Sequence, residues 1–436
     1  MQYRPAVIGF GPAGMFAALT LARLGLNPIV YEMGSRIDER VRKVESFFAG
    51  GELDERTNVC FGEGGAGTFS DGKLTTRIGD PLARYVVQTF ADFGAGDSIL
   101  TQAKPHVGTD KIRVAVAAIR EKIISLGGEV NFDSELIDIE ESGDCANLTI
   151  RRGGVDDVYP SGAVFIAAGH SAKGIYNLIG GKYPEAVAPK AYSVGVRIEH
   201  EQSYIDEIIY GKFAGHKNLP HAEYKLSHNN GKAGVYSFCM CPGGIVVNSA
   251  SERGTIVTNG MSYSKRNARN ANSAICVSVT PEDYGGTVEG AFAFREKLER
   301  GAYNMTNGFA PVQMLGDFIG NKTGSLARSR VKSSFTGQTA EVNLAELFPQ
   351  FVTDALLGGF ARFGETLKGY SHPGTVLIAP ETRTSSAVRL TRDGETMLLK
   401  GSRHIYPCGE GSGYAGGITS SAVDGIRTAI AAVKSK

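Results

Sequence analysis

The segment Gly9-Phe10-Gly11-Pro12-Ala13-Gly14 decides the fold of this 436-residue chain. A short apolar run at 6–8 precedes it, and an alanine- and leucine-rich run at 15–24 follows it and ends at Gly25. A second short apolar run occupies 28–31. This is the order of a strand, a tight turn, a helix and another strand, and the two strands of such a unit are parallel.

The glycine spacing in this segment is G-x-G-x-x-G, and it stands between a predicted strand and a predicted helix, as that motif requires. The first glycine permits the turn, the second lets a pyrophosphate approach the backbone, and the third lets helix and strand pack closely. The helix N-terminus offers amides and a partial positive charge to phosphates. Glu32 ends the second strand and can accept hydrogen bonds from ribose hydroxyls. We therefore predict a dinucleotide site at Gly9, Gly11, Pro12, Ala13, Gly14 and Glu32; the alternative is a purely structural turn.

Glycine is unusually frequent in the whole chain, at 57 of 436 residues. The average share is about 7%. No Gly-X-Y repeat is present, and with 42% hydrophobic residues and 16 prolines the chain is not a disordered one. The glycines therefore occupy folded positions, where the backbone takes unusual dihedral angles or approaches another group closely.

Charge and cysteine content exclude other classes. Lys and Arg number 46 against 45 Asp and Glu, which argues against a nucleic-acid field over the whole molecule but not against a local basic patch. Six cysteines in this length are no disulfide framework and favour a reducing, cytoplasmic setting. The apolar stretch 6–22 is not read as a signal peptide, because three glycines and Pro12 interrupt it. We predict no membrane association and no metal site.

Further periodic segments divide the chain into two domains. The first domain continues the short strands and the amphipathic or apolar helices of its N-terminal unit. Its strands are predicted at 129–132, 135–139, 147–152, 155–159 and 163–168, and its helices at 111–126 and 418–433. From about residue 192 the alternation typical of a half-buried antiparallel sheet replaces this pattern. Strand-like runs at 375–378 and 404–406 resume the strand type of the first domain. We predict an α/β fold: a three-layer Rossmann-like domain built from 1–190 and 374–436, with an inserted, mainly antiparallel α+β domain at 191–373.

Three later glycine-rich segments favour FAD over NAD. Ala168-Gly169 ends the apolar strand, Gly409-Glu410-Gly411 follows the strand at 404–406, and Gly416-Gly417-Ile418 opens the last helix. This arrangement resembles flavoproteins of the glutathione-reductase-like type. The resemblance implies that Glu410 stands where an aspartate more often holds the ribityl chain. It also implies that amides near Gly417 and Ile418 face the pyrimidine end of the flavin.

The most distinctive segment is Phe61-Gly62-Glu63-Gly64-Gly65-Ala66-Gly67-Thr68-Phe69-Ser70-Asp71-Gly72-Lys73-Leu74. Its composition is typical of a loop whose backbone wraps closely around a ligand. It lacks the Gly-Lys-Ser/Thr of a P-loop at the right spacing, which argues against an NTPase. We assign to the cofactor site Gly64, Gly65, Ala66, Gly67, Thr68 and Lys73, together with Arg40, one of three arginines after Glu32 that could reach the FAD phosphates.

The chain also resembles a bacterial family of uncharacterised FAD-dependent dehydrogenases. The resemblance covers nearly the whole chain and rests on the 61–74 segment, Gly169-His170-Ser171, the segments 237–244 and 258–262, and 407–418. It implies FAD and a flavoprotein oxidoreductase fold, but no particular substrate. Many relatives carry an additional region before the first glycine motif.

Flavin chemistry needs few protein side chains, so the catalytic residue is unknown. Alternation along a strand would point the thiols of Cys239 and Cys241 to one face, where they could form a redox pair. Two small buried cysteines are the alternative. His170 follows the strand that ends at Gly169 and could contact flavin or substrate, or simply pack or cap.

These observations predict an FAD-dependent oxidoreductase that transfers a hydride through flavin N5 to or from an unidentified small molecule. NAD(P)H, if it is the reductant, would bind transiently, because only one well-formed G-x-G-x-x-G is present. One alternative is an RNA-modifying flavoprotein that uses the basic clusters 265–269 and 328–332; nucleic acid is otherwise not expected. A second is a non-catalytic flavin sensor or electron carrier. An NAD-only dehydrogenase would leave the C-terminal glycine segment without a role. The oligomeric state is not predicted.

Overall fold

The computed structural model describes residues 3–229, 231 and 233–435, which form two compact units. The first unit consists of the described residues of Met1–Glu45, Asp54–Lys190 and Ser385–Lys436. The second consists of Ser46–Leu53 and Ala191–Thr384. The first unit is thus discontinuous in sequence, with most of the second unit inserted after Lys190.

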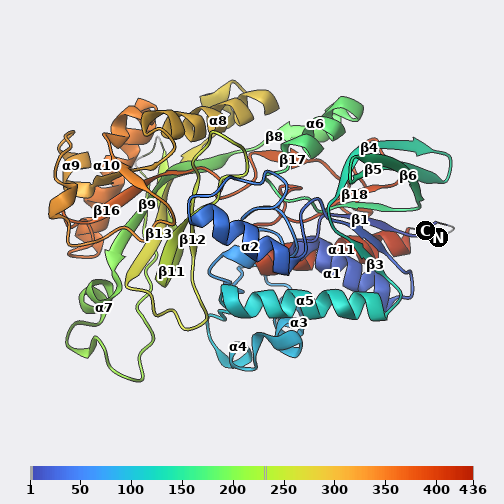
Figure 1. Ribbon diagram of the computed structural model, residues 1–436, viewed down its shortest axis with the longest axis horizontal. Coiled ribbons are helices and arrows are strands. Elements are labelled where there is room, and N and C mark those ends of the chain that lie inside the picture. The colour runs from blue at the N-terminus through green and yellow to red at the C-terminus, as the bar shows by residue number, and fades with distance from the viewer. Residues whose placement is uncertain (1–2, 230, 232, 436) are drawn as a thin grey trace. The chain divides into compact units, whose positions relative to one another are not determined.

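A five-stranded parallel sheet lies at the centre of the first unit (Figure 1). The strand order is β18 (Ile405–Pro407), β7 (Val164–Ile166), β1 (Ala6–Ile8), β2 (Ile29–Tyr31) and β3 (Glu129–Asn131). β1 pairs in parallel with β2 from Ala6↔Ile29 and with β7 from Ala6↔Val164. Short apolar strands of this kind are typical of a parallel sheet covered on both faces. The predicted parallel sheet is confirmed.

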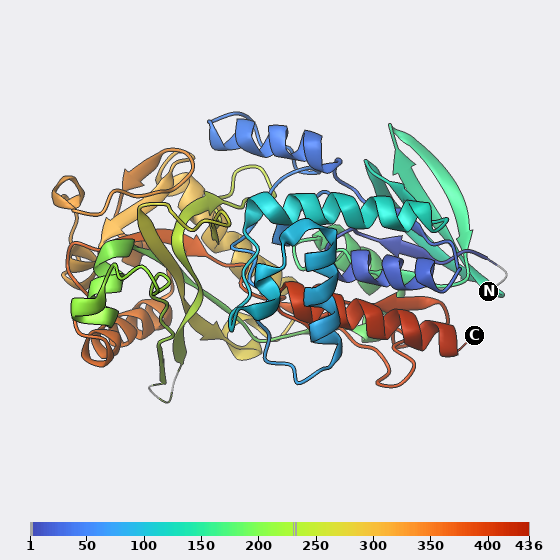
Figure 2. The same ribbon diagram turned by 90° about the horizontal axis from the view of Figure 1, so that it is seen from below.

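Helices cover one face of this sheet, and a small antiparallel sheet covers the other (Figures 1 and 2). The helices α1 (Pro12–Arg23), α5 (Thr109–Ser125) and α11 (Ile418–Lys434) share one hydrophobic core with β1 and β7. The opposite layer is the meander of β4 (Ser134–Ser142), β5 (Cys145–Arg152) and β6 (Val155–Ser161). Tyr31 of β2 contacts Tyr159 of β6, with ring centroids 5.6 Å apart. The predicted three-layer Rossmann-like fold is therefore confirmed.

Smaller elements complete the first unit. They are α2 (Ile37–Phe48), whose last residues are grouped with the second unit, α3 (Leu82–Phe90), α4 (Ser98–Thr101), α6 (Lys173–Lys182), and the pair β8 (Val187–Pro189) and β17 (Val388–Leu390). The sequence analysis assigns no helix between residues 33 and 80, so it missed α2.

An eight-stranded sheet dominates the second unit. Its strands are, in order, β10 (Ser227–Asn229), β11 (Gly234–Asn248), β13 (Asn270–Val279), β9 (Tyr192–Glu201), β16 (Val376–Glu381), β14 (Ala310–Met314) and β15 (Thr339–Glu341), with β12 (Thr258–Met261) paired to β11. All these pairs are antiparallel except that of β14 with β15. The helices are α7 (Gln202–Tyr210), α8 (Val288–Met305), α9 (Leu315–Ile319) and α10 (Gln350–Thr366). The mainly antiparallel α+β character of the insert is confirmed.

One predicted boundary is corrected. The run 375–378 was assigned to the first domain, with the insert ending at 373. β16 instead pairs with β9 and β14 in the sheet of the second unit, which extends to Thr384. The prediction placed β16 in the parallel sheet because this strand is buried on both faces and mostly apolar, which is also the pattern of parallel strands.

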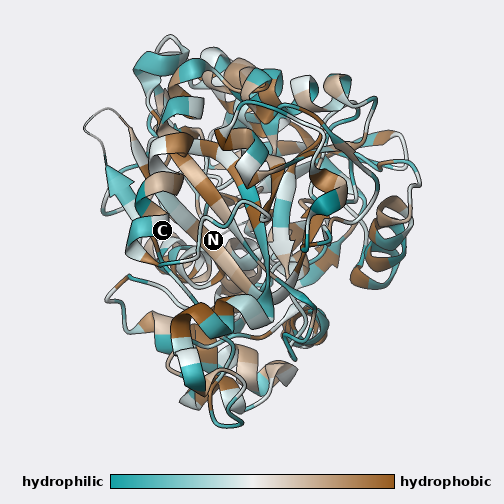
Figure 3. Cartoon of the chain, turned by 90° about the vertical axis from the view of Figure 1, so that its left-hand side faces the viewer, coloured by the Kyte–Doolittle hydropathy of each residue, from teal (hydrophilic) through white to brown (hydrophobic). Residues whose placement is uncertain are grey.

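No helix among the described residues is long and apolar enough to cross a membrane. Figure 3 agrees, since the helices in view carry both hydrophilic and hydrophobic residues. The same residues contain no group of three or more His, Cys, Asp or Glu side chains placed to hold a metal ion.

Candidate functional site

The N-terminal glycine segment forms a tight turn between β1 and α1. Gly9 has φ 96°, and a Cβ on Gly14 would lie 2.0 Å from the Gly9 carbonyl oxygen, so the third glycine is required for helix and strand to pack. Gly11 is the N-cap of α1 and Pro12 its first residue, and within the described residues no side chain caps this end. The first amides of a helix have no partner inside it, so those of α1 are available to an anion.

Glu32, at the end of β2, is 6% exposed and accepts three hydrogen bonds from backbone amides. Its Oε2 accepts from Phe10 at 2.8 Å, and its Oε1 accepts from Gly34 and Gly62, both at 2.9 Å. A carboxylate has about four acceptor positions. Glu32 therefore connects the turn at 9–14 to the glycine-rich segment 61–74, here called the glycine loop. About one acceptor position of its carboxylate is left for a ribose hydroxyl.

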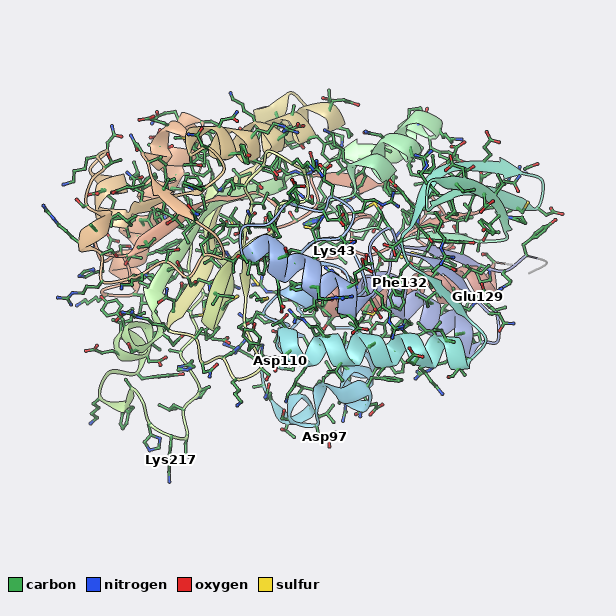
Figure 4. All side chains as sticks on the ribbon, viewed as in Figure 1. Lys43, Asp97, Asp110, Glu129, Phe132 and Lys217 are labelled. Carbon is green, nitrogen blue, oxygen red and sulfur yellow. The ribbon has the colours of Figure 1, made fainter. Side chains whose placement is uncertain are left out.

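Arg40, on α2, binds the backbone of the glycine loop. Its predicted contact with the FAD phosphates is wrong, for the following reason. The side chain is fully buried. It donates to five backbone carbonyls, those of Asn58, Val59, Gly62, Glu63 and Gly65, at 2.6–3.2 Å. A guanidinium has five N–H donors, so none is left for FAD. Lys43, one turn further along α2 and labelled in Figure 4, donates to Ser35 Oγ at 3.1 Å and pairs with Asp54 at 3.0 Å.

The glycine loop lies between the N-termini of two helices. Gly65 has φ 62°, and a Cβ there would lie 2.8 Å from the Cα of Gly11, so only glycine fits this close approach. A Cβ on Gly67 would lie 3.1 Å from Ile418 Cγ1 and 3.7 Å from Pro12 Cγ. The loop backbone thus bridges the start of α1 and the start of α11.

Thr68 is a second correction. It is fully buried, and its hydroxyl donates to the Glu63 carbonyl at 3.3 Å, so it holds the loop rather than facing a ligand. Its own carbonyl accepts from Thr109 Oγ1 at 2.6 Å, which fastens the loop to α5. Lys73 Nζ lies 4.0 Å from Asp71 Oδ2, and its contact with the cofactor stays a prediction.

The N-terminus of α11 is open in the same way as that of α1. Gly417 is its N-cap, and among the described residues no side chain caps it. A Cβ on Gly416 or on Gly417 would meet no atom within 4 Å. The same is true of Gly169, at the end of β7. These glycines border open space, whereas Gly14 and Gly65 border backbone.

Tyr176 of α6 joins the remaining parts of the site. Its hydroxyl donates to the Gly411 carbonyl at 2.7 Å and lies 3.3 Å from Ser386 Oγ and 3.4 Å from the Gly169 oxygen. The turn after β7 and the turn after β18 are thereby held together. Glu410, half-buried in the second of these turns, lies near Lys190, and its predicted role on the ribityl chain stays a prediction.

The burial of the predicted cofactor residues sorts them into two groups. Those that keep solvent-facing surface are Gly9, Gly11, Pro12, Gly65, Ala66, Gly67, Lys73, Ala168, Gly169, Glu410, Gly416 and Gly417. Those that are buried are Ala13, Gly14, Glu32, Arg40, Gly64, Thr68, Gly409 and Ile418. The first group joins two helix N-termini through a glycine-rich surface, which fits an extended ligand with a pyrophosphate. The residues of the second group are buried and support the backbone that forms this surface.

The predicted catalytic candidates fare differently. The regular alternation from which Cys239 and Cys241 were expected to share a face is interrupted, because the register of β11 against β13 shifts between Phe238 and Cys241 and Cys239 has φ 47°. Their action as a redox pair stays a prediction. Cys239 is half-buried and Cys241 fully buried. His170 is half-buried beside the open space at Gly169, and its contact with flavin stays a prediction.

Cys60 is a residue that the sequence analysis missed. It precedes the glycine loop and is half-buried. The Ser171 hydroxyl donates to its sulfur at 3.7 Å, which places the thiol next to the His170–Ser171 turn. The only available signal was its position immediately before the 61–74 segment.

Comparison with known proteins gives a family match for the second unit and a relative for nearly the whole chain. Residues 191–384 match the family described as FAD-dependent protein, C-terminal domain-like. A protein of Clostridium beijerinckii, described as uncharacterised, is 44% identical over 444 residues, which cover 98% of this chain and 80% of that protein.

Solved structures with similar folds share little sequence. The halogenase PltM in complex with phloroglucinol and FAD is 11% identical, covers 98% of this chain and 67% of its own, and has a TM-score of 0.45. A geranylgeranyl bacteriochlorophyll reductase-like protein from Thermoplasma acidophilum is 13% identical, with coverages of 99% and 79% and a TM-score of 0.43. The family match and the C. beijerinckii relative decide the assignment. The chain belongs to one family with the C. beijerinckii protein, its residues 191–384 match the C-terminal domain of FAD-dependent proteins, and its cofactor is FAD.

Proposed function

We propose that this protein is an FAD-dependent oxidoreductase that acts on a small molecule. The observation that carries the proposal is the glycine-lined surface of the first unit, which runs from the uncapped N-terminus of α1 to the uncapped N-terminus of α11. When bound, FAD supplies a redox centre that exchanges a hydride at its N5 atom.

Residues of the chain have distinct roles in this proposal. The first amides of α1 hold the pyrophosphate, and Glu32 accepts from the adenosine ribose with its remaining acceptor position. The amides at Gly417 and Ile418 meet the pyrimidine end of the flavin, and the partial positive charge at the start of α11 stabilises negative charge there. This assignment follows the glutathione-reductase-like arrangement, with Glu410 near the ribityl chain.

NAD(P)H, if it is the donor, binds transiently, because the chain has a single well-formed G-x-G-x-x-G. His170 and Cys60 are the side chains at the Gly169 edge of the surface that a substrate could meet.

Gly11→Ala tests the cofactor placement. A Cβ at Gly11 lies 3.6 Å from the Cα of Gly65, an ordinary contact, so the apoprotein should fold normally. The added methyl group occupies the approach path of the pyrophosphate, and we expect FAD affinity to fall at least about tenfold. Gly181→Ala, on the exposed face of α6, is the control, because a Cβ there meets no atom within 4 Å. FAD binding and thermal unfolding of both apoproteins are the measurements.

Unchanged FAD affinity in Gly11→Ala would contradict the placement. For the reaction itself, the oxidised protein is mixed with NADH or NADPH without oxygen, and the reduced protein with candidate acceptors, while the flavin spectrum is followed. A flavin that responds to dithionite but to none of a broad panel of small-molecule donors and acceptors would favour an electron carrier or sensor instead.

A further inference from the structure

Two basic segments of the second unit, far apart in sequence, lie side by side. Residues 253–281 and 321–340 each contain four Lys or Arg and no Asp or Glu. Asn270, at the start of β13, donates from Nδ2 to the Lys332 carbonyl at 2.8 Å. Glu199 of β9 accepts from the same Asn270 amide at 3.0 Å and from the Ser334 amide at 3.0 Å. The clusters 265–269 and 328–332 therefore belong to one region of the surface.

The segment 322–334, here called the basic strap, is anchored at both ends. Near its start, the amides of Gly324, Ser325 and Leu326 donate to Glu341 Oε1 at 2.8–3.1 Å. Further on, Ser329 Oγ donates to the Gly374 carbonyl at 2.8 Å, and Ser334 Oγ accepts from Val246 at 3.0 Å. A backbone fixed in this way loses little conformational entropy when a ligand binds.

The cations of the basic strap point outward. Val331 is buried and Ser329 half-buried, whereas Arg328, Arg330 and Lys332 are exposed, so burial alternates along the chain. Lys322 and Lys265 are exposed as well. Among the residues that the structure describes, none of these five cations forms an ion pair.

The acidic groups nearby are already engaged. Glu223 pairs with Arg266 at 2.9 Å, and Glu201 pairs with Arg269 at 2.5 Å. Asp317 accepts from the Ser325 amide at 3.1 Å, and Glu341 accepts the amides named above. The region thus presents uncompensated positive charge in a chain whose net charge is only +1. A surface of this kind is complementary to a polyanion.

An exposed aromatic ring narrows the choice of polyanion. Tyr263 is 47% exposed and lies in the same loop as Lys265. Thr323 of the basic strap is exposed, and hydroxyl groups supplement Arg and Lys in contacts with phosphates. Cations beside an aromatic platform are typical of proteins that bind unpaired bases.

We propose that the basic strap and the loop 263–269 bind single-stranded nucleic acid. Lys265, Arg328, Arg330 and Lys332 contact phosphates, and Tyr263 stacks on a base. The proposal concerns the second unit only and does not depend on the reaction proposed for the flavin.

The test uses the full FAD-loaded protein and fluorescence anisotropy with a labelled single strand of about 20 nucleotides. We expect binding that weakens steeply between about 50 and 200 mM salt. In the triple variant Arg328→Glu/Arg330→Glu/Lys332→Glu, affinity should fall more than tenfold, and the salt slope should decrease by about 2, because each phosphate contact on a single strand contributes about 0.7. The affinities for RNA and DNA strands of the same sequence are compared to determine which of the two nucleic acids the surface prefers.

A matched variant separates the surface from general electrostatics. Lys111→Glu/Lys297→Glu/Lys368→Glu makes the same change in net charge at exposed lysines elsewhere and should bind like the wild type. FAD content and thermal unfolding verify that each variant is folded. Tyr263→Ala should weaken binding about tenfold, whereas Tyr263→Phe should retain it, because stacking needs only the ring.

Three results would overturn the proposal. The first is no binding by the wild type at about 50 mM salt. The second is an equal loss of affinity in the strap variant and the matched variant. The third is binding to phosphatidylserine-containing vesicles, but not to vesicles of phosphatidylcholine alone, that exceeds binding to the oligonucleotide; this would assign the surface to an anionic membrane.

Discussion

Two arginines, one in each unit, are completely buried and keep their positive charge by different means. Arg40 in the first unit gives its donors to five backbone carbonyls. Arg197 in the second unit donates to both carboxylate oxygens of Glu381 at 2.9 Å and to Asn272 Oδ1 at 2.7 Å. Burial lowers the pKa of Arg40 to about 10. Burial acts in the same direction on Arg197, but the carboxylate of Glu381 outweighs it and raises the pKa of Arg197.

The two sets of partners give the two arginines different structural roles. The partners of Arg40 are main-chain oxygens, so the guanidinium determines the shape of a loop that has few side chains of its own. The partner of Arg197 is a side chain on a neighbouring strand, so the pair is one solution among several for filling the interior of a sheet. Backbone partners cannot be exchanged by mutation, whereas a carboxylate can.

Arg40→Met should have the largest effect. It removes five charge-assisted hydrogen bonds and takes from the Asn58 and Val59 carbonyls the donor that Arg40 supplies, and we expect a loss of about 5 kcal/mol or more in the free energy of unfolding of the first unit. Arg40→Lys should recover only part of this, because an ammonium has three donors and no planar fork. Denaturant unfolding and FAD content measure the effect. Full FAD content in Arg40→Met would show that the loop does not depend on this residue.

Arg197→Met should be nearly as severe, yet reversible by a second change. An uncompensated Glu381 carboxylate costs about 3–5 kcal/mol, and the double variant Arg197→Met/Glu381→Leu should regain most of it. Hydrogen exchange of β9 and β16 is the measurement. A double variant as unstable as the single one would remove the contrast between the two arginines.

His200 makes the second unit sensitive to acid. Its Nε2 lies 2.8 Å from the Tyr370 carbonyl, and burial, with His372 nearby, lowers the pKa of His200 to about 4. Because the folded pKa is below the unfolded value of about 6.5, the folded state excludes the proton. The contribution, about 3 kcal/mol, is present above pH 6.5 and lost as the pH falls toward 4. In His200→Gln the free energy of unfolding should fall less between pH 6.5 and 4, whereas His216→Gln, at an exposed site, should behave like the wild type. Denaturant unfolding at a series of pH values is the measurement. Equal pH dependence in the wild type and His200→Gln would refute the assignment.

Tyr176→Phe should produce the smallest effect. It tests whether another side chain of the first unit that donates to a backbone carbonyl also positions the cofactor surface. Removing the hydroxyl leaves the Gly411 carbonyl without its donor, which costs about 1–2 kcal/mol. We expect faster amide exchange at 409–413 and weaker FAD binding. Tyr183→Phe is the control, because it removes a comparable bond, to Glu141 at 3.0 Å, outside the site. If both variants bind FAD equally well, Tyr176 does not position the cofactor surface.

The sequence predicted the parallel sheet, the three layers and the two helix N-termini, because local glycine spacing and apolar periodicity carry that information. It did not predict the task of Arg40, since the five carbonyls come together only in the folded loop. A signal was nevertheless present: Ile37, Arg40 and Val44 form the buried stripe of α2, and an arginine inside such a stripe indicates a buried guanidinium. The irregular register at Cys239 had no comparable signal, because nothing in Cys-Met-Cys marks a residue with positive φ. Gly14 was predicted to let helix and strand pack, and a Cβ there would indeed meet backbone, whereas Gly65 was predicted only to contact FAD and also lies against backbone, that of Gly11.

The bridge between the glycine loop and α11 has a consequence for synthesis of the protein. Thr419 Oγ1 donates to the Leu74 carbonyl at 2.7 Å, across 345 residues of sequence. At a translation rate of about 5–20 residues per second, about 20–70 s pass between the emergence of these two partners from the ribosome. During that time the strands of the parallel sheet that have already been made lack the helix that covers part of their apolar face, and the cofactor surface lacks its second helix N-terminus. A nascent chain can therefore acquire FAD in the complete site only after its last helix has been made, and the incomplete first unit is the form that chaperones would meet.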